Sequence, residues 1–123
     1  MSKTAFVTKE KIEEIVKSYP TPFHLYDEKM LRQRLSDIKE AFSWNAGYRE
    51  YFAVKACPNP FLLKIMKEYG VGCDCSSKTE LMLAKACGFS GDEIMFSSNE
   101  TPASEYAYAK SISSLYINKY AAD

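Results

Sequence analysis

The sequence has no net charge, few cysteines and no long hydrophobic run. Its sixteen basic and sixteen acidic residues cancel, which argues against general attraction to nucleic acid or anionic lipid. No stretch approaches the roughly 18 uninterrupted apolar residues of a membrane span, and the first twenty residues lack the apolar core of a signal peptide. We therefore expect a cytoplasmic protein with no nucleic-acid or membrane partner.

Four cysteines in 123 residues are too few for a disulfide-dense scaffold, and they form no paired C-x-x-C zinc motif. We therefore expect reduced thiols and no metal site. The pair Cys73 and Cys75 would project to one face of a strand, which leaves a redox or soft-metal site as an alternative. No G-x-G-x-x-G or Walker loop follows any apolar run, so the common nucleotide-binding motifs are absent.

Two amphipathic helices are predicted before residue 45. Thr8 suits the N-cap of the first, whose apolar residues recur at helical spacing until Pro20. Asp27 suits the N-cap of the second, which ends at "SWNAG". The intervening segment, "TPFHLYD", is predicted to be a short extended strand.

From Tyr51 onward, β-forming runs alternate with helices. The runs begin near Tyr51, Cys73, Ile94 and Leu115, about 21 to 22 residues apart. The intervening helices carry start signals, which are Asn59 with Pro60, Ser77 with Glu80, and Thr101 with Pro102. Such a repeat requires parallel strands, either in an open doubly wound sheet or in an arc of a (β/α)8 barrel.

Alternation in "YFAVKA" favours the barrel. Tyr51, Ala53 and Lys55 would face its interior, while the residues between them would pack on helices. We therefore predict an α/β fold, a partial (β/α)8 barrel of about three to four β/α units preceded by an amino-terminal helix and a short strand. The predicted domains are residues 1–26, holding that helix and strand, and residues 27–123, holding the incomplete barrel.

Lys55 is the candidate catalytic residue, because barrel enzymes carry their chemistry at the carboxyl ends of the strands. A lysine removed from water loses its charge more readily, and the neutral amine can then attack a carbonyl. Pyridoxal phosphate is the cofactor that uses such a linkage routinely. The alternative is a lysine whose stem lies on apolar surface while its ammonium reaches solvent.

The stretches "TPFHLYD" and "YFAVKACPNPFLLKIMKEYGVGCDCSSKTELMLAKACGFSGDEIMFSSNET" resemble the amino-terminal part of the barrel of pyridoxal-phosphate-dependent decarboxylases with the alanine racemase fold. The resemblance is strongest to diaminopimelate decarboxylases, with ornithine decarboxylases as near relatives. It implies that Lys55 of "AVKA" holds the cofactor covalently and that Asp74 of "DCSSKTEL" lies near it. A carboxylate that satisfies a turn or a helix N-terminus is the alternative for Asp74.

The resemblance implies conversion of meso-diaminopimelate to lysine and a small amino-acid substrate, with an ornithine- or arginine-type decarboxylase as the alternative. A complete barrel needs about 250 residues, so the chain is expected to be an amino-terminal fragment that is inactive alone. Its open sheet edges predict a homo-oligomer. A non-catalytic cofactor-binding or regulatory relative, or a scaffold for interactions, remains as a further alternative.

Overall fold

The computed structural model describes residues 5–99 and 101–118, so the outermost residues of both predicted domains and residue 100 lie outside it. In chain order the elements are α1 (Lys9–Ser18), α2 (Glu28–Ala41), β1 (Tyr51–Ala53), the 3-10 turn η1 (Val54–Ala56), α3 (Pro60–Glu68), β2 (Gly72–Cys75), α4 (Lys78–Ala86), β3 (Gly91–Ser98), α5 (Ala103–Ile112) and β4 (Ser113–Asn118). None of the helices in this described part is long and apolar enough to cross a membrane.

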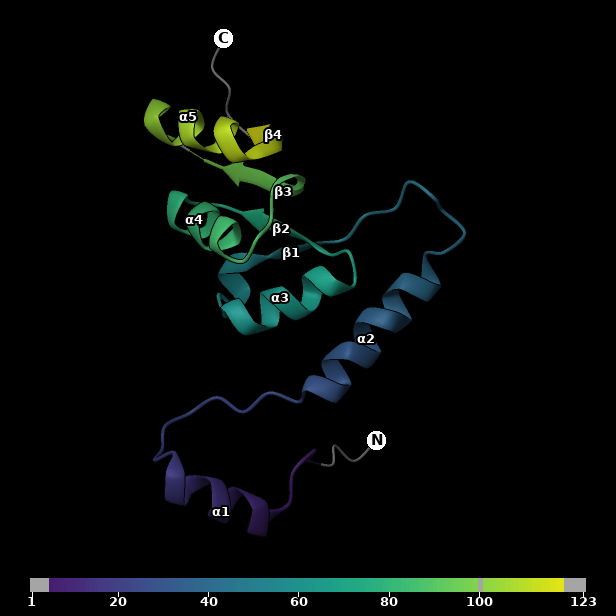
Figure 1. The fold of residues 1–123 in the computed structure, drawn as a ribbon, viewed down its shortest axis with the longest axis vertical. Helices are drawn as coiled ribbons and strands as arrows, with labels where there is room; N and C mark the ends of the chain where they lie inside the picture. Colours follow the sequence, from purple (N-terminus) through teal and green to yellow (C-terminus); the bar gives the residue numbers. More distant parts are fainter. Residues whose placement is uncertain (1–4, 100, 119–123) are drawn as a thin grey trace.

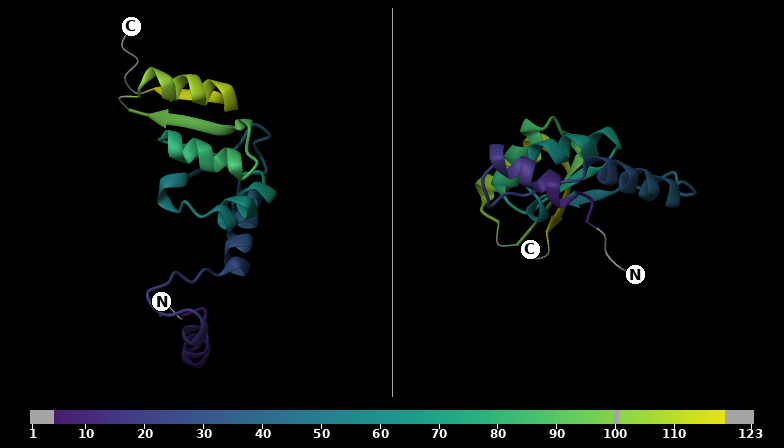
Figure 2. Two further views of the ribbon diagram at one scale, coloured as in Figure 1. Left: turned by 60° about the vertical axis from the view of Figure 1, so that its left-hand side comes forward. Right: turned by 90° about the horizontal axis from the view of Figure 1, so that it is seen from below.

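The four strands form one parallel sheet in the order β1-β2-β3-β4, so each strand pairs with its neighbour in the sequence. Helix α3 contacts α4, and α4 contacts α5, which places the three crossover helices on the same face of the sheet (Figure 2). A doubly wound sheet would divide its helices between two faces. The singly wound arrangement is that of a barrel arc, and it confirms the predicted fold class.

The core lies between the sheet and these three helices. Alternate strand residues are fully buried against the helices, namely Cys73, Cys75, Ile94 and Phe96. The opposite face is only partly covered. We call it the inward face and define it by Ala53, Asp74, Met95 and Ser97, which share one side because Asp74 pairs with both Ala53 and Met95 and Ser97 follows Met95 by two residues.

The predicted capping residues set the helix boundaries. Asn59 accepts a hydrogen bond from the Phe61 N–H at 3.0 Å and begins α3. Ser77 accepts one from the Glu80 N–H at 3.3 Å and begins α4. Each satisfies a backbone donor that the first helical turn leaves unpaired. The starts of α3 and α4 therefore follow the sequence signals closely. Helix α5 begins at Ala103, one residue after the predicted Pro102, and the buried Thr101 Oγ1 has no hydrogen-bond partner among the described residues.

The side chain of Tyr51 crosses the sheet near the amino ends of the strands. The side chain extends from β1 over Gly72 of β2, and its hydroxyl donates a hydrogen bond to the Asp92 carbonyl of β3 at 2.6 Å. A Cβ at Gly72 would stand 2.7 Å from the Tyr51 ring and 2.6 Å from the Glu93 carbonyl oxygen. Only glycine leaves room for this crossing.

The amino-terminal part differs from the expectation in one respect. Residues 20–26 are not a strand, because no described strand lies beside them to supply hydrogen bonds. Helix α1 forms as predicted but buries none of its residues, and Figure 1 shows it well away from the sheet. Helix α2 reaches the core through Leu35, and Arg32 pairs with Glu68 of α3 at 2.5 Å.

Candidate functional site

Lys55 lies just beyond the carboxyl end of β1. The strand ends at Ala53, and Lys55 is the middle residue of the turn η1, so the prediction that it occupies the strand is wrong. Pro58 and Pro60 follow closely, and a proline has no N–H with which to extend a ladder. Val54, the first residue of the turn, is fully buried and anchors the turn to the core.

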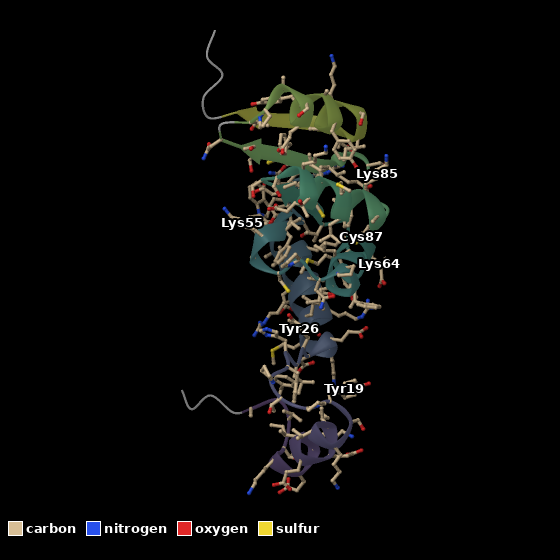
Figure 3. The ribbon with its side chains drawn as sticks, turned by 90° about the vertical axis from the view of Figure 1, so that its left-hand side faces the viewer. Tyr19, Tyr26, Lys55, Lys64, Lys85 and Cys87 are labelled. Atoms are coloured by element: carbon tan, nitrogen blue, oxygen red, sulfur yellow. The ribbon has the colours of Figure 1, made fainter. Side chains whose placement is uncertain are left out.

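The Lys55 side chain is exposed to solvent, so the prediction of an amine removed from water does not hold for this arc. Figure 3 places Lys55 at the end of the sheet toward which the β3 arrow points. The four-strand arc does not enclose its inward face, so the amine remains hydrated. This exposed position agrees with a lysine whose ammonium simply reaches solvent, and it also agrees with an amine that a cofactor can reach. A covalent role for Lys55 therefore stays a proposal.

Asp74 lies on the inward face of β2, one strand away from Lys55. It pairs with Ala53 and Met95, and its Oδ1 accepts a hydrogen bond from the Ser97 hydroxyl of β3. The alternative role at a helix N-terminus is filled by others: Ser77 caps α4, and Glu80 accepts from the Ser76 N–H at 2.8 Å. The carboxylate therefore faces the barrel interior rather than a turn.

Sequence reasoning missed Ser97 as a partner of Asp74. The pairing depends on the register between β2 and β3, which local patterns do not specify. A signal was nevertheless present in "EIMFSS", because alternation from Met95 puts the hydroxyl of Ser97 on the inward face beside the neighbouring strand.

Sequence reasoning also missed Tyr26, whose hydroxyl lies 3.5 Å from the Cys57 Sγ. This hydrogen bond raises the pKa of Tyr26 above its usual value, with partial desolvation as a smaller cause. Cys57 follows Lys55 by two residues, and its N–H donates to the Val54 carbonyl at 3.2 Å. Tyr26 therefore ties the segment before α2 to the turn that carries Lys55.

All four cysteines are free thiols, as expected. Cys73 and Cys75 point away from Asp74 into the core. Burial raises the pKa of the Cys73 thiol to about 12, and it raises that of Cys75 well above the usual range. Among the described residues, no group of three or more His, Cys, Asp or Glu side chains could hold a metal ion.

The burial of these thiols predicts selective labelling. At pH 8 a thiol reagent should modify the half-exposed Cys57 first. The rate of modification of Cys73, Cys75 and Cys87 should be lower by roughly 100-fold or more. Mass spectrometry of timed samples measures this, and full labelling in urea is the control. Rapid modification of Cys73 in the folded chain would contradict the burial described here.

The residues present fit pyridoxal phosphate in two respects. Lys55 offers an accessible primary amine at the functional edge of a barrel arc, and an amine can combine with the cofactor's aldehyde. Asp74 offers a carboxylate, already oriented by Ser97, on the inward face beside that edge. The structure therefore combines a parallel, singly wound arc with an exposed lysine just after its first strand.

The comparisons identify the family. Residues 28–119 match the family described as pyridoxal-dependent decarboxylase, pyridoxal binding domain. The chain belongs to this family, as the sequence predicted, and the family's cofactor is pyridoxal phosphate.

Individual proteins agree with this assignment. Protein TabA of Pseudomonas amygdali pv. tabaci is 47% identical over 98 residues, covering 80% of this chain and 23% of that protein. Diaminopimelate decarboxylase of Bacteroides thetaiotaomicron is 42% identical over 76 residues, covering 62% and 20%. The crystal structure of the Helicobacter pylori diaminopimelate decarboxylase complexed with L-lysine matches with a TM-score of 0.78 and 28% identity, covering 89% of this chain and 28% of that one. The chain thus spans only about a quarter of the length of these relatives.

Proposed function

We propose that this chain is the cofactor-binding part of an amino-acid decarboxylase that acts on meso-diaminopimelate, with Lys55 as the residue that carries pyridoxal phosphate. The observation that carries the proposal is the exposed amine of Lys55, held on a turn at the carboxyl edge of a singly wound parallel sheet. Membership of the pyridoxal-dependent decarboxylase family supports the cofactor.

Each proposed role belongs to a particular atom. The Lys55 Nζ, in its neutral form, would hold the cofactor by condensing with its aldehyde, whose oxygen leaves as water. Once the substrate amine had displaced it, the same Nζ could move a proton to the product. Val54, the buried first residue of the same turn, fixes the backbone from which the Lys55 side chain extends. The Asp74 carboxylate, held by Ser97 on the next strand of the sheet, would help to orient the bound group. When bound, pyridoxal phosphate supplies the electron sink for loss of the carboxylate.

The substrate is proposed from the relatives. Diaminopimelate decarboxylases are among them at 42% and 34% identity, and the Helicobacter pylori structure holds L-lysine, the product of removing one carboxylate from diaminopimelate. An ornithine- or arginine-type activity is the alternative within the class. Cofactor binding without turnover is the second candidate function, and the name of Protein TabA, at 47% identity, states no reaction that would decide between the two.

We propose a homo-oligomer from the open sheet edge and a cytoplasmic location from the free thiols. The outer edge of β1 has no neighbouring strand among the described residues, and the inward face is partly exposed. Both features favour a homo-oligomer, because open edges and uncovered sheet faces recruit partners. Four free thiols favour a reducing compartment, in keeping with a cytoplasmic protein.

One experiment tests the proposal. The protein is incubated with pyridoxal phosphate, reduced with borohydride and mapped by mass spectrometry. Labelling concentrated on Lys55 supports the proposed role, whereas labelling spread evenly over exposed lysines such as Lys64 and Lys85 counts against it. Release of carbon dioxide from meso-diaminopimelate but not from ornithine then separates the proposed substrate from the alternative.

A further inference from the structure

The hydrogen bond between Ser97 and Asp74 joins two strands on the inward face. Asp74 belongs to β2 and stands opposite Met95 of β3, so Ser97 lies one inward-facing position closer to the carboxyl edge. Its hydroxyl donates to the Asp74 Oδ1. Both side chains are half-buried, and the backbone of Ser97 is held in the ladder with β4. The donor is therefore mounted on a rigid element.

The Ser97 hydroxyl restricts the side-chain rotamer of Asp74. An aspartate on a strand can occupy more than one χ1 rotamer, and a hydrogen bond to a charged acceptor selects the rotamer that keeps it. Partial burial strengthens that bond, because fewer water molecules compete for the Asp74 oxygen. The orientation of Asp74 thus depends on a residue of the neighbouring strand.

We propose that Ser97 is a positioning residue of the site: its hydroxyl holds the Asp74 carboxylate in one orientation and so speeds the reaction of Lys55 with the pyridoxal aldehyde. This inference rests on the proposed function. Ser97 does not itself need to touch the cofactor. Ser97 affects the rate at Lys55 only by orienting Asp74, so the experiments measure both the Asp74 rotamer and that rate.

The chain contains its own control. Ser98 is the next residue on β3, and within the described part of the chain its hydroxyl makes only a local contact with the Asn99 carbonyl at 3.5 Å. Ser98→Ala therefore removes the same group from the same strand without touching Asp74. Ser97→Thr keeps a hydroxyl on a β-branched side chain suited to a strand and serves as the conservative variant.

The first experiment needs no cofactor. Three-bond couplings between the Hα and Hβ protons of Asp74 report its χ1 rotamer by nuclear magnetic resonance. We expect one dominant rotamer in the unmodified chain, in Ser97→Thr and in Ser98→Ala, and averaged couplings in Ser97→Ala. Identical couplings in Ser97→Ala and the unmodified chain would overturn the proposal.

The second experiment measures the rate of borohydride-trapped adduct formation on Lys55. Ser97→Ala should slow it about tenfold, the loss expected for removing one hydrogen bond to a charged group, while Ser97→Thr and Ser98→Ala stay within about twofold of the unmodified chain. In an Asp74→Ala background, which removes the acceptor, Ser97→Ala should cause no further loss. A tenfold loss that persists in that background would show that Ser97 acts without Asp74 and would overturn the proposal.

The two levels of inference fail differently. If the unmodified chain forms no adduct on Lys55, the proposed function fails and this inference falls with it. If Lys55 is labelled selectively but Ser97→Ala reacts at the unmodified rate, only the role of Ser97 is wrong.

Discussion

Replacing Lys55 with alanine is expected to abolish the borohydride-stable pyridoxal adduct, with a loss on the order of 100-fold in labelled chain. The amine is the only group of that side chain able to combine with an aldehyde. Lys55→Arg should lose the adduct equally, because the guanidinium keeps its charge under all ordinary conditions. Peptide mapping after reduction measures the label, and absorbance of the bound cofactor gives a second readout.

Lys64→Ala is the matched control for this experiment. Lys64 is an exposed lysine on α3, and Figure 3 shows it apart from Lys55. Its removal should leave the label on Lys55 unchanged. Both variants alter solvent-exposed side chains, so their free energies of unfolding should stay within about 0.5 kcal/mol of the unmodified chain. Equal labelling of the Lys55→Ala and Lys64→Ala chains would refute a special role for Lys55.

Replacing Gly72 with alanine should destabilise the fold by about 2–3 kcal/mol, because the added methyl group would overpack the crossing of Tyr51 over β2. The new Cβ would meet the Glu93 carbonyl oxygen at 2.6 Å and the Tyr51 ring at 2.7 Å. The backbone oxygen belongs to the adjacent strand and cannot move without disturbing the ladder. Urea denaturation followed by circular dichroism measures the loss.

Gly47→Ala is the control, because its added Cβ would meet only the Asn45 Oδ1 at an ordinary 3.5 Å. Its effect should stay below about 0.5 kcal/mol. Adding Tyr51→Ala to Gly72→Ala should not restore stability, because the contact with the Glu93 oxygen remains and the hydrogen bond to Asp92 is lost. Equal stability of the two glycine variants would refute the close approach at Gly72.

Local chemistry explains why the β/α order could be predicted. Asn59 and Ser77 each satisfy a helix N-terminus through their own side chain, so the signal and the structure lie within three residues of each other. The fully buried alternation of Cys73 and Cys75 is likewise a property of one strand. Features that involve only neighbouring residues can be recognised from a short stretch of sequence alone.

Features that join distant segments were not predictable in the same way. The end of β1 at Ala53 depends on where pairing with β2 stops, and the extended segment before α2 has no neighbouring strand in the part of the chain that the structure describes. The exposure of Lys55 depends on how much of the barrel surrounds it. The contact between Asp74 and Ser97 needs the register of two strands. Local hints existed for two of the long-range contacts. A glycine inside a strand, such as Gly72, often marks a close approach, and the alternation in "EIMFSS" puts Ser97 on the inward face.

The half-exposed Cys57 makes this chain convenient for optical measurements. Its thiol is two residues from Lys55, while the other three thiols are buried. A fluorophore attached there would sit within a few ångströms to a nanometre of any pyridoxal group on Lys55, and the overlap of their spectra would quench its emission. Arrival and departure of the cofactor could then be followed in real time in a stopped-flow instrument, without any substrate.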